Sequence, residues 1–415
     1  MPIATLVEEI LGSDLPIGFE AYDGSRTGPP DAKAKLVLHS PDALRRIVTA
    51  PGELGFGRAY VAGDLDIEGD IFDALVLRDK ITSLRMEPRT WLRALKVIGL
   101  GGLRPIRPPA EEARLHGRLH SKERDAAAIA HHYDVSNDFY RIVLGPSMTY
   151  SCAVWDNPDV GLERAQAAKH ELVCRKLGLE PGMRLLDVGC GWGSMAIHAA
   201  QHHGVHAVGV TLSRRQAELA SKRVAEAGLS DRIEIRLQDY RDVDDGPYDA
   251  ISSIGMFEHV GLKMLRVYFD RLFSLLRPGG RLLNHAISRP ADGRKTRVSP
   301  RGFIARYVFP DGELHEVGAV TTALQQSGFE ARHMESIREH YSLTLHAWVR
   351  NLERDWAAAV AEVGAPRARV WRLYMAASAV NFDANTIQVH QVLGVKPDGT
   401  RSGMPLRPRF EDTVG

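Results

Sequence analysis

Residues 185–193 read Leu-Leu-Asp-Val-Gly-Cys-Gly-Trp-Gly, and this stretch decides the fold. The largely apolar run that ends at Val188 predicts a buried parallel strand. Glycines follow at the alternate positions 189, 191 and 193, and residues 194–201 are compatible with a helix. Such a strand, glycine turn and helix N-terminus form a cradle in which backbone N–H groups face a closely bound ligand.

The glycine spacing favours one kind of ligand. Ser194 stands where the dinucleotide-binding fingerprint has its third glycine, so the match to that fingerprint is poor. Asp187 lies two residues before the turn, where a carboxylate can support the loop or bind an ammonium group. The stretch resembles the first motif of class I S-adenosylmethionine-dependent methyltransferases. A tight strand-to-helix turn in another kind of α/β protein is the alternative.

Strands and helices alternate through the residues that follow. Strands are expected at 205–210, 232–237, 248–254, 281–288, 330–336 and 387–395. Helices are expected at 213–227 and 316–326, with helical residues 342–380 inserted before the last strand. The pattern predicts an α/β fold, a class I methyltransferase doubly wound and mostly parallel sheet with a helical insertion, whose ligands bind at the carboxyl ends of the strands.

A chain of 415 residues is long enough for two domains. Short strands, turns and helices in residues 1–110 predict a smaller N-terminal α+β domain, and a basic linker follows at 111–124. The basic segment 88–109, described below, is the reason to expect this domain to be associated with lipid or membrane. The methyltransferase domain is expected at 125–396 and a C-terminal tail at 397–415. The glycine-rich stretch 52–64 suits either close approach to a ligand or tight turns in a compact core.

Composition excludes several classes of protein. A net charge of +1 gives no reason to expect nucleic acid as a partner. The three cysteines are too dispersed for a disulfide framework or a zinc knuckle. His131 and His132 lack a third ligand at a suitable spacing, so no metal site is expected. Because we find no signal peptide and no run of about 18 apolar residues, we expect a cytoplasmic protein.

One basic segment points to a membrane surface. Residues 88–109 carry five Lys or Arg and no acid, interleaved with Trp91 and aliphatic residues. Such a segment suits the interface of an anionic bilayer, where each basic residue contributes about 1 kcal/mol. An amphipathic helix packed on its own protein is an equal alternative. We therefore expect peripheral attachment to the inner membrane surface as one of two interpretations.

Polar residues after the strands are candidates for binding S-adenosylmethionine. A carboxylate usually takes the ribose hydroxyls after the second strand, but residues 209–213 contain no acid, so Thr211, Ser213 and Gln216 are expected to replace it. Residues 238–240 then offer an amide, a carboxylate for the adenine amino group and a ring for stacking. The expected cofactor-binding residues are Tyr150, Ser151, Asp187, Gly189, Cys190, Gly191, Gly193, Thr211, Leu212, Ser213, Gln216, Gln238, Asp239 and Tyr240.

Further motifs make the resemblance specific. They are Tyr150-Ser151-Cys152, Leu185–Gly193, Thr211-Leu212-Ser213, Gly-Met-Phe-Glu-His-Val-Gly at 255–261, His285 and His340-Tyr341. Over residues 125–395 the chain resembles cyclopropane-fatty-acyl-phospholipid synthases and mycolic acid cyclopropane synthases. The segments 145–152, 283–285 and 307–314 are most similar to an actinobacterial branch that converts oleoyl chains to 10-methylene acyl groups, the precursors of 10-methyl-branched lipids.

The resemblance implies methyl transfer to the cis double bond of an unsaturated acyl chain in a membrane phospholipid. The π electrons attack the sulfonium methyl group, and a bound bicarbonate ion removes a proton from the resulting carbocation. Glu258 beside that anion implies either a shared proton or a Glu258 that orients His285, and a coupled titration is expected. By position in the family motifs, the expected catalytic residues around bicarbonate are Cys152, Glu258, His285 and Tyr341, with backbone at Gly255 and Ile287.

Departures from the family pattern bear on lipid and product. Asp383 stands where the phospholipid-acting enzymes tend to have Arg, and Asn284 and Ala286 flank His285 where Leu and Thr are usual. Altered neighbours of the base are expected to favour the exocyclic methylene over cyclopropane, which is the main competing product.

Methylation of a small amphiphile and non-catalytic lipid binding are two further interpretations of the sequence. Reduction to a methyl branch requires a partner reductase, since no second nucleotide motif is present, and a homodimer is expected.

Overall fold

The computed structural model describes residues 2–12, 14–77, 99, 104–113, 124, 135–293, 299, 302–310 and 312–410. By Cα proximity the chain forms two compact units, each made of three segments. Unit 1 comprises residues 1–114, 299–310 and 352–380, and unit 2 comprises 115–298, 311–351 and 381–415. Two segments that the sequence assigns to the methyltransferase domain therefore group with the N-terminal residues.

Unit 1 contains a four-stranded sheet in the order β2-β1-β3-β4, with β1 and β3 parallel and the other pairs antiparallel. Its strands are β1 Gly18–Ala21, β2 Arg26–Thr27, β3 Ala34–Leu38 and β4 Leu65–Gly69. Its helices are α1 Ile3–Leu11, α2 Pro41–Thr49, α3 Glu53–Ala62, α4 Ile71–Ala74, η1 Leu75–Leu77, α13 Phe303–Tyr307, α16 Trp356–Val363 and most of α17 Ala365–Asp383. The N-terminal residues are thus α+β, as expected.

The glycine-rich stretch 52–64 forms the helix α3. A Cβ atom on Gly55 would lie 2.3 Å from a backbone carbonyl oxygen at the C-terminal end of α2, so the absent side chain lets the two helices approach. A Cβ atom on Gly57 would lie 2.3 Å from the ring of Phe303 on α13. Of the two interpretations that the sequence leaves open, close packing in a compact core is the one that the structure shows.

Unit 2 is built on an eight-stranded sheet with the order β11-β12-β9-β8-β5-β6-β7, and β10 pairs with β9 off this path. β12 is antiparallel to both β9 and β11, and the other pairs are parallel. The strands are β5 Arg184–Val188, β6 His206–Thr211, β7 Ile233–Leu237, β8 Tyr248–Ile254, β9 Leu276–Arg289, β10 His315–Glu316, β11 Glu330–Ser336 and β12 Gln388–Val395. The doubly wound, mostly parallel sheet is confirmed.

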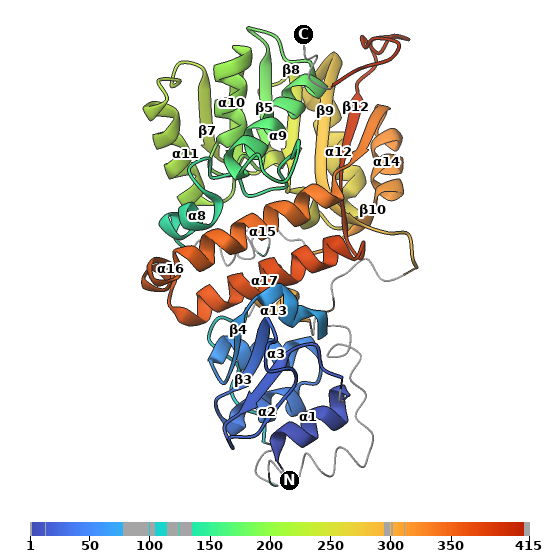
Figure 1. The fold of residues 1–415 in the computed structure, drawn as a ribbon. Helices are drawn as coiled ribbons and strands as arrows, with labels where there is room; N and C mark the ends of the chain where they lie inside the picture. The colour runs from blue at the N-terminus through green and yellow to red at the C-terminus, as the bar shows by residue number, and fades with distance from the viewer. Residues whose placement is uncertain are drawn as a thin grey trace. The chain divides into compact units, whose positions relative to one another are not determined.

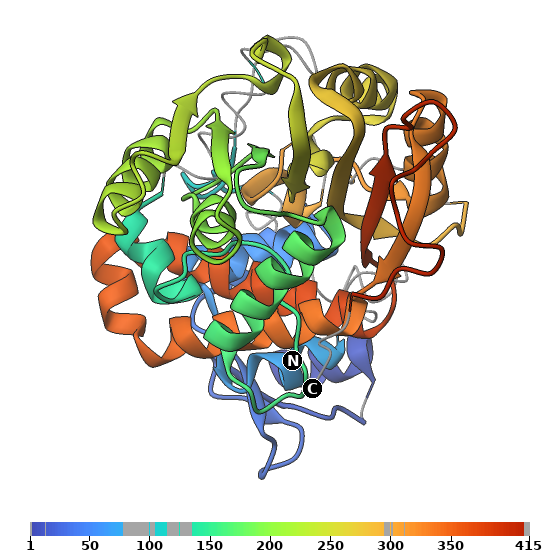
Figure 2. The same cartoon turned by 90° about the horizontal axis from the view of Figure 1, so that it is seen from above.

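Helices cover both faces of this sheet (Figures 1 and 2). Leu185 of β5 packs in an apolar cluster with α9, α10 and α11, whereas the next residue, Leu186, packs with α12 and α14. Since successive strand residues point to opposite faces, these two helix groups lie on opposite sides. The helices are α8 Asn137–Leu144, α9 Leu162–Leu177, α10 Ser194–His203, α11 Arg214–Glu226, η3 Tyr240–Asp242, η4 Phe257–His259, η5 Leu262–Met264, α12 Leu265–Leu275, α14 Val317–Gln326 and α15 Arg338–Arg354.

Local signals place some boundaries well and others poorly. Ser213 caps α11, because its hydroxyl oxygen accepts from the Gln216 N–H at 3.3 Å. The strand expected at 281–288 is wrong at its start, since β9 begins at Leu276. Leu276 pairs with Tyr248 on β8, ahead of the proline-glycine segment that suggests a turn. Pairing with a neighbouring strand overrides the local turn signal here.

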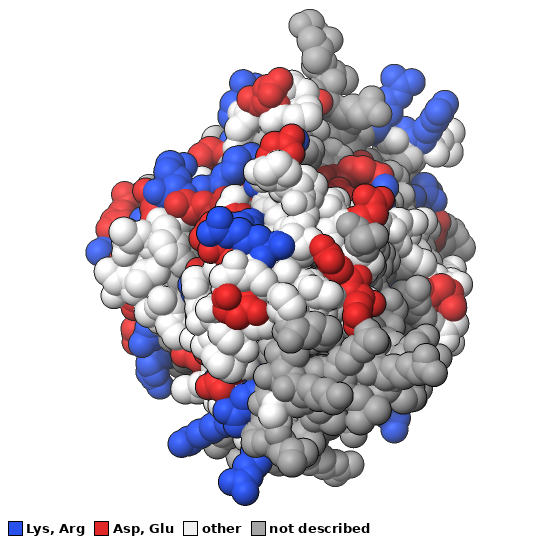
Figure 3. All heavy atoms as spheres, turned by 60° about the horizontal axis from the view of Figure 1, so that its bottom comes forward, with Lys and Arg blue, Asp and Glu red and all other residues white. Residues whose placement is uncertain are grey.

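Three features concern membrane attachment: the length and apolar character of the described helices, the charges on one face, and the basic segment 88–109. Among the described residues, no helix combines the length and the apolar character that crossing a bilayer requires. Figure 3 shows a face on which Lys and Arg side chains are interspersed with Asp and Glu. Most of the basic segment 88–109 lies outside the described residues, which include only 99 and 104–109 of it. Attachment to an anionic surface stays a prediction.

Candidate functional site

A cavity in unit 2 lies where β5, β6 and β8 end, at the carboxyl edge of the parallel strands. Ligands of open α/β sheets bind at this edge. The cofactor-binding residues expected from the sequence line the cavity, except Gly193 and Ser213. Those two act as helix caps, Gly193 for α10 and Ser213 for α11. We call this space the cofactor cavity.

The glycine turn forms one wall of the cofactor cavity. Gly189, Gly191 and Gly193 all have positive φ, at 75°, 55° and 79°, a conformation that side chains other than glycine rarely adopt. The N–H groups of Gly189 and Cys190 both donate to the Val210 carbonyl oxygen at 3.0 Å. The turn after β5 is therefore fixed by β6, and its open side faces the cavity.

Only one of the two oxygens of the Asp187 carboxylate has a hydrogen-bond partner in the described part of the protein. Its Oδ1 accepts from the Ser252 hydroxyl at 2.7 Å, whereas Oδ2 is buried and has no hydrogen-bond partner among the described residues. Burial raises the pKa of Asp187 to about 6, against the Ser252 bond and the Lys169 charge, which lower it. A buried acceptor without a partner at a cavity wall fits a cationic donor on a ligand, such as the ammonium group of S-adenosylmethionine.

The residues expected at the ribose form a small network of their own. The Thr211 hydroxyl donates to Gln216 Oε1 at 2.7 Å and accepts from the Ser213 N–H at 3.2 Å. The Gln216 amide nitrogen can therefore donate to a ribose hydroxyl, because the amide oxygen is already used. Asp239, expected at the adenine, forms an ion pair with Arg241, whose Nη2 lies 2.6 Å from Oδ2.

Sequence reasoning missed Lys169 on α9. Its side chain is buried and lines the cofactor cavity, and Nζ donates to Ser151 Oγ at 3.2 Å. Burial lowers the pKa of Lys169 to about 8, while the Asp187 carboxylate opposes that shift. A lysine one helical turn from Ala165 and from Val173, in the middle of an apolar stripe, is the signal that could have found it.

A second polar group, which we call the Glu258–His285 site, lies where β8 and β9 run side by side. Glu258 Oε1 accepts from the Ile287 N–H at 2.6 Å, and its Oε2 is buried with no partner among the described residues. Burial raises the pKa of Glu258 to about 7, against the Ile287 bond, which lowers it. The Gly255 N–H donates to the His285 carbonyl oxygen at 2.9 Å, and Gly255 also lines the cofactor cavity. Hydrogen bonds thus connect Glu258 with Ile287 and Gly255 with His285, and Gly255 places the second pair next to the cofactor cavity.

His285 is held in one tautomer by a chain of hydrogen bonds. The Lys176 ammonium donates to Gln391 Oε1 at 2.7 Å, and an ammonium group cannot accept, so the Gln391 amide nitrogen faces His285 Nδ1 at 3.2 Å. Nδ1 therefore accepts, and the neutral ring carries its proton on Nε2. Burial, helped by Lys169 and Lys176, lowers the pKa of His285 well below its usual range, which keeps the ring neutral.

Cys152 is a neutral thiol in this structure. Its side chain is buried, and Sγ donates to the carbonyl oxygens of Ala153 at 3.2 Å and Ile337 at 3.6 Å. Burial raises its pKa well above the usual range, although the Lys169 charge opposes the shift. A thiol of this kind is no nucleophile at neutral pH.

Tyr341 on α15 belongs to a row of aromatic side chains. Its ring stacks on Phe382 with 4.7 Å between centroids and lies edge-on to Trp348 at 6.0 Å. Trp348 in turn contacts Tyr150, a residue of the cofactor cavity, at 5.3 Å. The structure thus connects Tyr341 to the cofactor cavity through two rings.

Comparison with known proteins identifies this arrangement. Residues 120–392 match the family described as mycolic acid cyclopropane synthetase. The chain belongs to this family. A probable fatty acid methyltransferase of Mycobacterium tuberculosis is 50% identical over 409 residues, which cover 95% of each chain. The tuberculostearic acid methyltransferase UfaA1 of the same species is 35% identical over 91% of this chain and 87% of its own. The Escherichia coli cyclopropane-fatty-acyl-phospholipid synthase is 35% identical over 87% and 88%.

Solved structures of the mycolic acid cyclopropane synthetase family agree with the fold of unit 2. The cyclopropane synthase MmaA2 from Mycobacterium tuberculosis is 34% identical, with a TM-score of 0.62 over 67% of this chain and 100% of that one. CmaA1 in complex with SAH and CTAB is 33% identical, with a TM-score of 0.61 over 65% and 97%. This family member is thus an enzyme, an S-adenosylmethionine-dependent methyltransferase of fatty acyl chains, and the expected class I methyltransferase fold is confirmed.

Proposed function

We propose that the enzyme methylates the cis double bond of oleoyl chains in membrane phospholipid and gives a 10-methylene acyl group. The observation that carries the proposal is a pair of buried carboxylates, Asp187 and Glu258, each with one oxygen that has no partner among the described residues. Gly255 lines the cofactor cavity and bonds to His285, which connects the cavity with the Glu258–His285 site. Similarity to UfaA1, named a tuberculostearic acid methyltransferase, supports this branch of the family.

The residues of the cofactor cavity can orient the methyl donor. Asp187 Oδ2 offers an acceptor to the ammonium group of S-adenosylmethionine, and the Gln216 amide nitrogen offers a donor to the ribose. Tyr240 lies in the cavity wall at the position expected for stacking on adenine. Orientation carries much of the catalysis here, because an alkene is a weak nucleophile that no base can activate by deprotonation.

The reaction then follows from the alkene. Its π electron pair forms the new C–C bond to the methyl group while the C–S bond breaks, which leaves a positive charge on the neighbouring acyl carbon. A 1,2-hydride shift moves that charge to the methyl-bearing carbon, and loss of one methyl proton gives the exocyclic methylene. Proton loss from the methyl group without the shift closes a cyclopropane ring instead. Buried surroundings exclude water that would otherwise trap the cation.

The Glu258–His285 site fits a bicarbonate ion, which would supply an oxygen base for the lost proton. The His285 Nε2–H would donate to an anionic oxygen of the ion, and Glu258 Oε2 would accept from its O–H group. With its pKa raised to about 7, Glu258 can share that proton. The Gly255 and Ile287 N–H groups already have protein acceptors, so in this structure they leave the anion to the two side chains.

The residues that flank His285 do not contact its ring. Ala286 packs with α12 and α14, and by strand alternation Asn284 points the same way, whereas His285 faces Gln391 on the opposite side. Their expected influence on the product therefore does not run through contact with the His285 ring. The choice of methylene over cyclopropane rests on the likeness to the tuberculostearic acid enzyme.

The test is the fatty-acid profile of a bacterial host without cyclopropane lipids that expresses the enzyme and receives oleate. Methylene and cyclopropane products have the same mass, so NMR or ozonolysis must locate the added carbon. A methylene at carbon 10 supports the proposal in full. A cyclopropane ring would agree with the proposed mechanism but contradict the proposed 10-methylene product. Unchanged lipids would contradict the proposed oleoyl substrate.

The proposal places the enzyme in the cytoplasm at the inner membrane surface, as a homodimer, with a separate reductase that completes the methyl branch. The missing second nucleotide motif in the sequence supports the separate reductase. Sedimentation with vesicles of anionic and of neutral phospholipid tests the membrane part. Equal binding to both kinds of vesicle would contradict an electrostatic contribution.

A further inference from the structure

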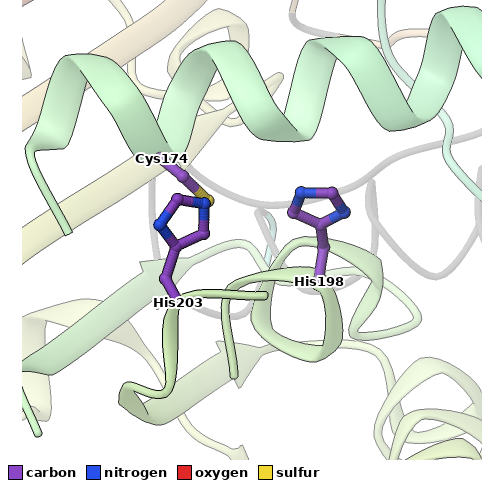
Figure 4. Close-up of side chains that lie close together, drawn as sticks. All are labelled: Cys174, His198 and His203. Carbon is purple, nitrogen blue, oxygen red and sulfur yellow. The ribbon is translucent and has the colours of Figure 1, made fainter. Parts of the chain in front are cut away.

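A cluster between α9 and α10 brings together three atoms that can bind a metal ion. Cys174 Sγ and one ring nitrogen each of His198 and His203 lie within 4.8 Å of one another. In Figure 4, Cys174 extends from α9 toward His203, and His198 stands beside them on the same side of α10. None of the three lines the cofactor cavity, and none belongs to the Glu258–His285 site. The sequence gives no hint of this group, because its cysteines are dispersed.

Glu171 is the hydrogen-bond partner of both histidines in the cluster. Its Oε2 lies 3.3 Å from His198 Nε2 and 2.9 Å from His203 Nε2. Ligand atoms at about 2.0–2.3 Å from one tetrahedral zinc ion are about 3.3–3.7 Å apart. The three ligand atoms of the cluster lie within 4.8 Å of one another and have to move closer together to reach this spacing. Glu171 lies three residues before Cys174 on α9, so both side chains face α10.

The hydrogen bonds of the cluster decide which ring nitrogens can bind an ion. Nε2 of His198 and Nε2 of His203 donate to the Glu171 carboxylate, so in each neutral ring Nδ1 carries the lone pair. Burial raises the pKa of the Cys174 thiol above its usual range, so a bound metal has to displace the thiol proton.

We propose that Cys174, His198 and His203 form a binding site for a zinc-type divalent ion, with Glu171 holding both histidines through hydrogen bonds. One thiolate and two imidazoles suit Zn²⁺, with water as the fourth ligand, and do not suit Mg²⁺ or Ca²⁺, which prefer oxygen ligands. The ion joins α9, which carries Lys169, to α10, which begins at the glycine turn, and so stabilises two elements of the cofactor cavity. The competing explanation is a Glu171 that only bridges two histidines, with Cys174 as an apolar core residue.

The first test is spectroscopic and uses the unmodified chain. Full-length enzyme without a polyhistidine tag is freed of metal with a chelator and titrated with Co²⁺. We expect one equivalent to bind with the visible bands of tetrahedral cobalt and a near-ultraviolet thiolate charge-transfer band, and Zn²⁺ to abolish both. Calorimetry in buffers of different ionisation enthalpy should show one proton released per ion. Binding without the charge-transfer band, as at surface histidines, overturns the proposal.

Variants then test the individual ligands. Cys174→Ser should remove the charge-transfer band, and His198→Gln should weaken Zn²⁺ binding at least about 100-fold. His206→Gln, which alters an exposed histidine at the start of β6, is the matched control and should bind normally. Zn²⁺ should raise the Tm of the unmodified enzyme and of the control but not of His198→Gln. Equal Tm shifts in all three proteins would contradict the site, and if Cys174→Ser fails to fold, the cobalt spectrum still decides.

Discussion

The cofactor cavity and the Glu258–His285 site lie next to each other but are built in different ways. The cavity takes its residues from loops that directly follow consecutive strands, and most of its polar groups already bond one another. The Glu258–His285 site joins side chains from β9, β12 and the segment after β8, and several of them are fully buried. The proposed reaction gives a reason for the difference, because a carbocation would have to be kept from water, whereas a polar cofactor tolerates solvent.

The largest expected effect comes from Glu258→Gln. Glutamine keeps an oxygen for the Ile287 N–H but cannot take up or share a proton, so turnover should fall by about 10³-fold. The affinity for S-adenosylmethionine, measured by calorimetry, should stay unchanged. Glu218→Gln, an exposed change on α11, is the control. A large loss of cofactor affinity in Glu258→Gln would show that Glu258 belongs to the cofactor-binding site.

The same carboxyl makes stability depend on pH. Because folding raises its pKa from 4.5 to about 7, Glu258 stabilises the folded state fully below about pH 4.5 and loses this contribution as the pH rises through about 7. Relative to Glu258→Gln, the unmodified enzyme should therefore lose about 3 kcal/mol of unfolding free energy over that window. Urea titrations at several pH values measure the difference. Asp187 titrates in both proteins, so its contribution to the pH dependence of stability cancels in the difference between them.

A smaller effect, confined to the cofactor cavity, is expected from Asp187→Asn. The amide can still accept from Ser252 but turns an N–H donor or a neutral oxygen toward the ligand ammonium group, so Kd for S-adenosylmethionine should rise about 10- to 100-fold. Turnover at saturating cofactor should change little. Ser252→Ala, which keeps the carboxylate, should change Kd less. If both variants affect Kd equally, the unpartnered oxygen is not the cofactor ligand.

The smallest effect concerns the tautomer of His285. In Gln391→Glu, a carboxylate that only accepts replaces the amide donor, so Nδ1 becomes protonated and Nε2 can no longer donate. We expect turnover to fall about tenfold, the loss of one hydrogen bond, with unchanged cofactor affinity. Nitrogen NMR of His285 reports the tautomer directly. Gln388→Glu on the same strand is the control and should leave the NMR spectrum of His285 unchanged. An unchanged tautomer in Gln391→Glu would show that the hydrogen bonds from Lys176 through Gln391 do not set the tautomer of His285.

Sequence alone predicts the local parts of both sites. The strand, the glycine turn and the Ser213 cap depend on neighbouring residues, and the expected bounds of β8 and β11 match the structure to the residue. The cofactor cavity follows because loops after parallel strands share one edge of the sheet.

Contacts between distant segments explain what the sequence does not predict. Gln391 meets His285 across 106 residues, through the register of two antiparallel strands that no motif encodes. Lys169 looks like one more surface lysine until α9 is packed on the sheet. The metal-binding cluster likewise exists only once α9 lies against α10, which explains why dispersed cysteines and histidines suggest no site.

The place of β12 in the sheet has a consequence for biosynthesis. β12 lies between β9 and β11 and is the last of the described strands to be synthesised. Since chains emerge from the ribosome N-terminus first, β11 has no neighbour in the sheet, and the His285 ring no donor, until residues 388–395 have been made. The nascent chain can therefore form its cofactor turn early, whereas the tautomer of His285 is fixed only after Gln391 has been added.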